Sequence, residues 1–189
     1  MNLPNSLTVT RIFLVPLLVV VLLTTFEGRR IFGVPRELMG AAIFGVASLT
    51  DWLDGYFARR RHQVTAFGQF VDPLADKLLT VAAFVSLVQM GLAPAWMVAI
   101  ILGRDFAITA LRSYAYTRGV SMPASPLGKF KMVAQIVAIL ALILGKDHLQ
   151  QFAVVGEIAL WVAVVTALIS AADYFRRFSW VAGPRGSKS

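Results

Sequence analysis

Six apolar stretches of about 20 residues each, divided by short polar breaks, dominate this chain. They cover residues 7–26, 38–57, 70–90, 95–116, 127–145 and 152–172. A helix of that length crosses the hydrocarbon core of a bilayer and satisfies its own backbone hydrogen bonds, which an open strand cannot do. Hydrophobic residues make up 58% of the 189 positions, more than a soluble domain needs. We therefore predict an all-α integral membrane protein with six transmembrane helices and no open strand in the lipid.

The polar breaks contain glycine, proline or clustered charges, as connectors between helices usually do. No internal repeat is visible, and the length suits a single domain. We predict one transmembrane domain over residues 1–182. Residues 183–189 are mostly small or polar, so we predict that they form a short disordered tail.

The formal net charge is +8, from 18 Lys and Arg against 10 Asp and Glu. Most of these cations flank the apolar stretches, where they set topology and attract anionic lipids, so we predict no nucleic-acid partner. If the helices alternate in direction, the cations divide unequally between the two sides. One side carries Arg59, Arg60, Arg61, Arg118, Lys129, Lys131, Arg176, Arg177, Arg185 and Lys188, and the other carries Arg29, Arg30, Arg36 and Lys146. We therefore predict a multi-pass protein of the cell inner (cytoplasmic) membrane with both termini in the cytoplasm.

One motif specifies eight residues: D-x-x-D-G-x-x-A-R, then eight positions, then G-x-x-x-D-x-x-x-D. Its members are Asp51, Asp54, Gly55, Ala58, Arg59, Gly68, Asp72 and Asp76. The four carboxylates lie in or beside apolar stretches, where charge is unfavourable and indicates a function. Spacings of three and four residues place each pair of aspartates on one helix face.

Four carboxylates gathered at one point would repel each other, and two divalent cations would balance their charge. Hard oxygen ligands favour Mg²⁺ or Mn²⁺. The chain has no cysteine, and its two histidines, His62 and His148, fall in expected connectors, so nothing in the sequence favours zinc. Two divalent ions held close together form a clamp for in-line attack on phosphorus. The alternative for carboxylates at this depth is an ion or proton pathway.

The small residues of the motif leave bare helix surface beside the carboxylates. A flat group such as a nucleotide can approach the backbone at Gly55, Ala58 or Gly68. The alternative for each glycine alone is close packing against another helix. Arg59 lies at the expected helix end, where its guanidinium can pair with phosphate.

Further charges lie in the fourth and fifth apolar stretches. If the fourth helix enters from outside the cell, Arg104, Asp105 and Arg112 come progressively nearer to the cytoplasm. Lys129 and Lys131 begin the fifth helix on that side. Together with the four aspartates, these charges predict one polar active-site cavity that opens to the cytoplasm.

Residues 50–79, TDWLDGYFARRRHQVTAFGQFVDPLADKLL, resemble the signature of the CDP-alcohol phosphotransferase family. All eight signature residues are present at the family spacing, and the six-helix count agrees. The segments PNSLTVTR, GRDFAITALR and GKFK resemble one bacterial subgroup, whose members transfer a phosphatidyl group from CDP-diacylglycerol to sn-glycerol 3-phosphate. Members of this subgroup often carry Glu where this chain has Asp105 and Thr where it has Met132.

The resemblance implies a transferase of phospholipid biosynthesis with a role for each motif residue. Two Mg²⁺ or Mn²⁺ ions would be held by Asp51, Asp54, Asp72 and Asp76. Asp76 would also be the catalytic base that takes the proton of the acceptor hydroxyl. The nucleotide of CDP-diacylglycerol would be contacted by Asn5, Thr8, Gly55, Ala58, Arg59, Thr65 and Gly68. The resemblance also implies a homodimer embedded among membrane lipids.

A phosphorylated acceptor needs cations that the metal ions do not supply. The candidates are Arg104, Arg112, Lys129 and Lys131, and they favour an anionic acceptor over choline or ethanolamine. For Arg104 the alternative is an internal ion pair with Asp105 or a motif aspartate. For the two lysines the alternative is anchoring at the cytoplasmic surface.

Two functional alternatives remain beside the transfer to sn-glycerol 3-phosphate. The first is another enzyme of the same family with a different acceptor, such as cardiolipin synthase or phosphatidylinositol phosphate synthase. The second is a carrier of cations or protons that performs no chemistry.

Overall fold

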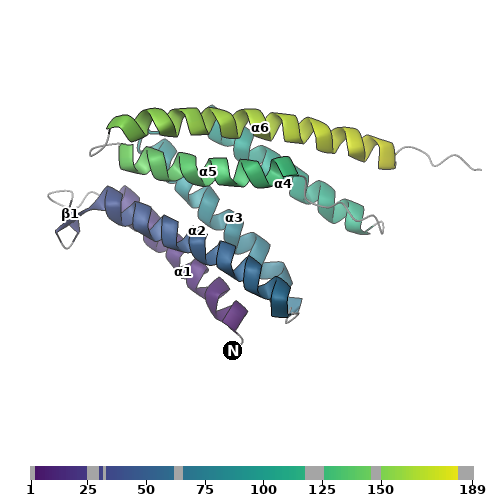
Figure 1. Ribbon diagram of the computed structural model, residues 1–189, viewed down its shortest axis with the longest axis horizontal. Coiled ribbons are helices and arrows are strands. Elements are labelled where there is room, and N and C mark those ends of the chain that lie inside the picture. Colours follow the sequence, from purple (N-terminus) through teal and green to yellow (C-terminus); the bar gives the residue numbers. More distant parts are fainter. Residues whose placement is uncertain are drawn as a thin grey trace, which may run out of the picture.

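The computed structural model describes the backbone of residues 3–24, 30–31, 33–61, 66–117, 126–145 and 150–182. Side chains are described for residues 13–24, 33–50, 77–115, 128, 130–145 and 151–176. The described backbone forms α1 (Leu3–Leu23), β1 (Arg30–Ile31), β2 (Val34–Pro35), α2 (Arg36–Arg61), α3 (Ala66–Gln89), α4 (Ala95–Thr117), α5 (Pro126–Gly145) and α6 (Gln150–Ala182). Each of the six apolar stretches overlaps one of these helices (Figure 1), so the prediction of a helical protein is confirmed.

One connector contains two short strands, which the apolar pattern does not predict. β1 and β2 form a two-residue antiparallel hairpin, in which Arg30 pairs with Pro35 and Ile31 with Val34. Gly33 turns the chain with a φ of +81°, a conformation that glycine adopts without strain. The hairpin lies in a predicted connector between α1 and α2, where the argument against lipid-facing strands does not apply.

The helices extend further than the apolar stretches that predicted them. The largest difference is at α6, which has 33 residues and ends at Ala182, ten positions beyond the stretch that ends at residue 172. At 1.5 Å per residue α6 is about 50 Å long. An apolar stretch indicates which part of a helix contacts lipid or the protein core. The helix continues beyond this stretch where the following residues have sufficient helix propensity.

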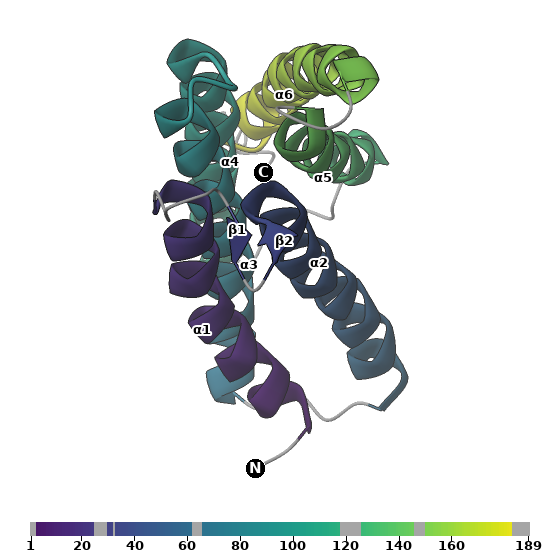
Figure 2. The ribbon, with the colours of Figure 1, turned by 90° about the vertical axis from the view of Figure 1, so that its left-hand side faces the viewer.

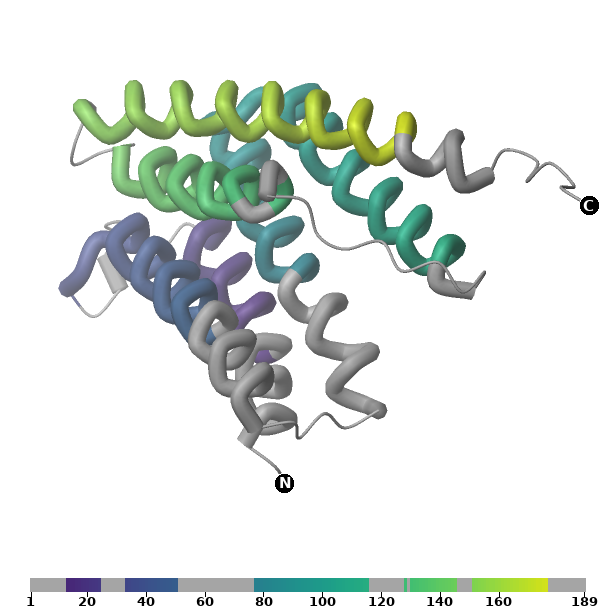
Figure 3. Tube along the Cα trace, turned by 45° about the vertical axis from the view of Figure 1, so that its right-hand side comes forward, coloured from purple at the N-terminus to yellow at the C-terminus, as the bar shows by residue number. Residues whose placement is uncertain are grey.

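The helices form two groups, which we call the N-terminal group (α1, α2 and α3) and the C-terminal group (α4, α5 and α6). Within the first, α1 packs on α2 and α3, and within the second, α6 packs on α4 and α5. Figure 2 shows the two groups from one end of the molecule. They meet through contacts of α2 with α5 and of α3 with α4 and α5. Figure 3 shows α4 crossing α6 at an angle while α5 runs beside it.

The antiparallel pair α5 and α6 packs closely at one end because of two glycines. A Cβ atom added to Gly145 would lie 2.5 Å from the backbone nitrogen of Ala153, and one added to Gly156 would lie 2.9 Å from the backbone nitrogen of Leu142. Both distances are shorter than van der Waals contact, so only glycine permits this approach of the two helices. We call this region the glycine end of the pair.

The core is apolar, and many apolar side chains also point outward. Its largest fully buried apolar side chains are Phe44, Phe84, Leu18, Leu22, Leu87, Ile101, Ile139, Ile143 and Leu160. Outward-facing side chains include Phe13, Val46 and Ile158, which are 71%, 61% and 59% exposed. Within the described residues one helical segment, Gln151–Arg176, is long and apolar enough to cross a membrane, with a mean hydropathy of 2.3. Shorter apolar helical segments are Phe13–Leu23, Lys77–Gln89 and Phe130–Gly145.

Candidate functional site

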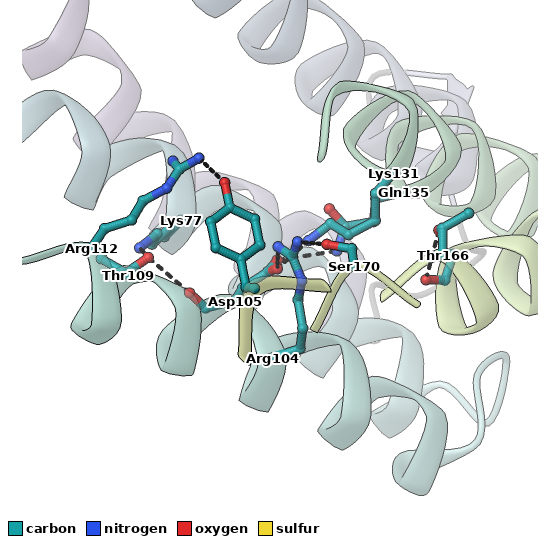
Figure 4. A network of polar contacts seen from close by, with 11 residues as sticks. Lys77, Arg104, Asp105, Thr109, Arg112, Lys131, Gln135, Thr166 and Ser170 are labelled. Carbon is teal, nitrogen blue, oxygen red and sulfur yellow. Dashed lines mark hydrogen bonds and ion pairs between the residues drawn. The ribbon is translucent and has the colours of Figure 1, made fainter. Parts of the chain in front are cut away.

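A cavity of about 300 Å³ lies where five helices converge. Its described lining includes Ser48 of α2, Lys77 of α3, Arg104 of α4, Lys131 of α5 and Tyr174 of α6. The described lining residues come from the middle of α2, α3 and α4, from the first two thirds of α5 and from the second half of α6. Polar side chains from four of these helices form one network around it (Figure 4).

Asp105 is the centre of this network. Its Oδ1 accepts hydrogen bonds from Arg104 Nη1 at 3.1 Å and from Lys131 Nζ. Its Oδ2 accepts one from Gln135 Nε2 at 3.3 Å. The side chains of Arg104 and Lys131 are only 10% and 5% exposed, and that of Asp105 is 20% exposed. Charges this deeply buried need partners, and Asp105 supplies the same carboxylate to both cations.

A second set of contacts joins α4 to α6. Arg104 Nη2 donates a hydrogen bond to Ser170 Oγ, and Arg112 Nη2 donates one to the Tyr174 hydroxyl. The Tyr174 ring also lies near both guanidinium groups, with its centroid 6.0 Å from Arg104 Cζ and 5.2 Å from Arg112 Cζ. Both distances are within the range of cation–π attraction. The two arginines are therefore held from the α6 side.

Lys77 links the N-terminal group to the same network. Its Nζ donates to Thr109 Oγ1, and Thr109 Oγ1 donates to the backbone oxygen of Asp105 at 2.8 Å. Among the described lining residues the cavity thus has four cationic side chains, those of Lys77, Arg104, Arg112 and Lys131, against the one carboxylate of Asp105. An excess of buried positive charge makes the cavity suited to a small anion.

Two buried donors in this cavity are unsatisfied. Arg104 Nε and Arg112 Nε have no hydrogen-bond partner among the described residues. A buried N–H without an acceptor is unfavourable by about 1–3 kcal/mol. An oxyanion in the cavity would supply acceptors for both guanidinium groups.

The structure brings three of the four predicted acceptor-binding cations to one place, because Arg104, Arg112 and Lys131 all line the cavity. The side chain of Lys129 lies outside the described residues. The alternative of an internal ion pair for Arg104 is also confirmed, with Asp105 as the partner. Lys131 is 4% exposed and paired with Asp105, so the alternative of a surface anchor is wrong for this lysine.

The eight motif residues lie on α2 and α3, and their side chains are outside the described ones. Asp51, Asp54, Gly55, Ala58 and Arg59 are in the second half of α2, and Gly68, Asp72 and Asp76 are in the first half of α3. Asn5 and Thr8 are on α1, also without described side chains, and Thr65 falls outside the described backbone.

Helical register relates the motif aspartates to the cavity. Ser48 lies one turn before Asp51 on α2, and Thr80 lies one turn after Asp76 on α3. Ser48 and Thr80 both line the cavity, so the positions of Asp51 and Asp76 follow on the helix faces that border it. Carboxylates are the hard oxygen donors that Mg²⁺ and Mn²⁺ prefer. Among the side chains that are described, no three His, Cys, Asp or Glu residues form a possible metal site.

Sequence reasoning missed several members of the network, namely Thr109, Gln135, Ser170 and Tyr174. One signal could have found them. In three helices the polar residues of the network are four apart within apolar sequence: Asp105 and Thr109, Lys131 and Gln135, and Ser170 and Tyr174. Pairs at this spacing share a helix face, which here is the face that borders the cavity.

Residues 1–169 match the CDP-alcohol phosphatidyltransferase family. A Bacillus subtilis protein named CDP-diacylglycerol–glycerol-3-phosphate 3-phosphatidyltransferase is 46% identical over 190 aligned residues, which cover 96% of each chain. A Rickettsia typhi protein of the same name is 38% identical over 93% of this chain and 96% of its own. A Mycobacterium tuberculosis protein named probable phosphatidylglycerophosphate synthase is 38% identical over 93% of this chain and 81% of its own. With most of its length matched in this way, the chain belongs to the CDP-alcohol phosphatidyltransferase family and is a transferase.

Proposed function

We propose that this protein makes phosphatidylglycerophosphate by transferring a phosphatidyl group from CDP-diacylglycerol to sn-glycerol 3-phosphate, with release of CMP. One observation carries the choice of acceptor: among its described lining residues, a cavity that borders the motif helices holds four buried or half-buried cations against one carboxylate. The names of the relatives support the same reaction. A neutral or cationic acceptor headgroup would leave the positive charge of this cavity unbalanced.

The acceptor phosphate is bound by Arg104, Arg112 and Lys131. Asp105 orients Arg104 and Lys131, and α6 orients Arg104 and Arg112. The donors for the phosphate are therefore fixed before it binds. Lys129 adds a further cation at the start of α5. With its phosphate held there, the acceptor extends its primary hydroxyl toward the α2 and α3 faces that carry the aspartates.

Asp76 takes the proton of that hydroxyl on a carboxylate oxygen. The hydroxyl oxygen forms a bond to the phosphorus that carries diacylglycerol, and the bond from this phosphorus to the CMP oxygen breaks. Asn5, Thr8, Gly55, Ala58, Arg59, Thr65 and Gly68 hold the cytidine nucleotide. The small residues let it approach the helix backbone, and the Arg59 guanidinium pairs with its phosphate.

The family generally depends on divalent metal ions. In this chain Asp51, Asp54, Asp72 and Asp76 would hold two of them, with Mg²⁺ or Mn²⁺ favoured by the oxygen donors. When bound, such ions neutralise charge on the diphosphate and on the leaving CMP, and they acidify the attacking alcohol.

We further propose six membrane spans with the cavity open to the cytoplasm of the inner membrane. The family is membrane-associated, and even the shortest helix, α5 with 20 residues, is about 30 Å long. The outer face of α6 supports contact with lipid, because it exposes large apolar side chains at helical spacing: Val154, Ile158, Trp161, Val165 and Leu168. The implied homodimer stays a prediction.

The test is an assay of the purified protein in detergent with labelled CDP-diacylglycerol, Mg²⁺ and one acceptor at a time. We expect CMP release and phosphatidylglycerophosphate with sn-glycerol 3-phosphate. Inositol 1-phosphate and phosphatidylglycerol, the acceptors of the two alternative enzymes, should give no product. Product with one of those acceptors only would replace the proposal by the corresponding alternative. CMP release without any ion gradient would exclude a carrier as the main function.

A further inference from the structure

Two side chains of α6 contact the two arginines of the cavity. Ser170 Oγ accepts a hydrogen bond from Arg104, and the Tyr174 hydroxyl accepts one from Arg112. Ser170 and Tyr174 lie one turn apart on the same face of α6, and both are buried. They fall just beyond residue 169, where the match to the family ends.

The Tyr174 ring acts on both arginines at once. Its centroid is within 6.0 Å of Arg104 Cζ and 5.2 Å of Arg112 Cζ, and the negative face of an aromatic ring attracts each cation. Two guanidinium groups that share a buried cavity repel each other. A ring within reach of both offsets part of this repulsion and fixes where each group lies.

The contacts with α6 determine which donors remain for a ligand. A guanidinium carries five N–H groups in one plane, so a bond to one nitrogen sets the direction of the others. In both arginines an Nη atom is bound to α6, while the buried Nε has no partner among the described residues. The donors left over are therefore oriented before any ligand arrives.

We propose that Ser170 and Tyr174 are positioning residues for the acceptor phosphate: they orient Arg104 and Arg112 and thereby select a phosphorylated acceptor. This inference rests on the proposed function. Both residues act through an arginine. Thr166 lies one turn before Ser170 on the same face but serves its own helix, because its hydroxyl donates to the backbone oxygens of Val162 at 2.7 Å and Ala163 at 3.1 Å (Figure 4).

The experiment measures kcat and both KM values for Ser170→Ala and Tyr174→Phe, with Thr166→Val as the matched control. Loss of a hydrogen bond to a charged group should raise the KM for sn-glycerol 3-phosphate about tenfold in each variant. The KM for CDP-diacylglycerol and kcat should stay within about twofold, because the lost interaction concerns acceptor binding alone. Inorganic phosphate, used as a competitive inhibitor, should bind each variant about tenfold more weakly. Thr166→Val should change none of these values.

A double-mutant cycle separates positioning from a general structural role. In an Arg112→Ala background, Tyr174→Phe should have no further effect on the KM for sn-glycerol 3-phosphate, and Ser170→Ala should have none in an Arg104→Ala background. Additive effects, or equal increases in both KM values, would overturn the inference. So would unchanged KM values in an enzyme that is active with sn-glycerol 3-phosphate. A wild-type protein that makes no product from this acceptor would instead refute the proposed function.

Discussion

The two ends of the α5–α6 pair differ in how closely the helices pack and in the polarity of the side chains between them. At the glycine end, Gly145 and Gly156 let the two backbones approach so closely that a single added Cβ would clash. At the other end, Lys131 and Gln135 of α5 and Tyr174 of α6 line a cavity of about 300 Å³, and Ser170 of α6 binds the lining residue Arg104. We call this region the polar end. The first arrangement maximises packing between helices. The second leaves a cavity lined by charged and polar side chains. Under the proposed function, one end of this helix pair therefore contributes to stability and the other end to acceptor binding.

The most severe test of this division is Asp76→Asn on α3, next to the cavity residue Lys77. The substitution removes the proposed base and one proposed metal ligand while preserving the size of the side chain. We expect kcat to fall by at least about 10³-fold. CMP release from CDP-diacylglycerol measures the loss, and the thermal midpoint of the purified variant should not fall. Activity near that of the wild type would remove Asp76 from the mechanism.

Asp105→Asn tests whether the polar end is also structural. The change leaves Arg104 and Lys131 without a carboxylate in a site where both are largely buried. Breaking a buried ion pair on one side lowers the free energy of unfolding by about 3 kcal/mol. Denaturant titration measures this value, and Asp105→Glu should restore most of it because the charge returns. If Asp105→Asn were as stable as the wild type, the network would not contribute to the stability of the fold.

Gly156→Val challenges the glycine end. The new side chain would overlap the backbone nitrogen of Leu142 at 2.9 Å, so the helices must separate. Overpacking of this kind lowers the free energy of unfolding by about 2 kcal/mol. Gly103→Ala is the matched control, since an added Cβ there meets nothing within 4 Å. The KM for sn-glycerol 3-phosphate should stay the same in the folded fraction of both variants, and a large increase in it would show that the two ends are coupled.

Arg112→Ala should have the smallest effect and the most specific one. Removal of one phosphate-binding cation should raise the KM for sn-glycerol 3-phosphate about tenfold or more and change kcat little. Steady-state assays with each substrate varied in turn would measure this difference. An unchanged KM would show that the acceptor binds elsewhere. A fall in kcat alone would mean that Arg112 acts only in the transition state.

The number and order of the helices could be predicted because apolar length is a strong signal for helices in lipid. The ends of α6 could not, since nothing in the apolar pattern shows that a helix continues to Ala182. The β1–β2 hairpin was missed because two-residue strands carry no periodicity.

For the site, too, some residues could be predicted from the sequence and others could not. Charged residues within apolar stretches, such as Arg104, Arg112 and Lys131, are conspicuous in the sequence, and the cavity contains all three. The hydroxyl side chains of the site do not stand out in the sequence in this way. Ser170 binds an arginine while Thr166, one turn away, bonds to its own helix, and only the packing of α4 on α6 distinguishes the two.

The hydrogen bond from Lys77 to Thr109 crosses the boundary between the two helix groups. Under the proposed function, the N-terminal group handles the diphosphate of the lipid donor and the C-terminal group handles the water-soluble acceptor. The distance between attacking oxygen and phosphorus is then a property of how the two groups dock, and no single side chain sets it. A change in bilayer thickness or lateral pressure that shifts this docking would therefore change the reaction rate, although it alters no contact with either reactant.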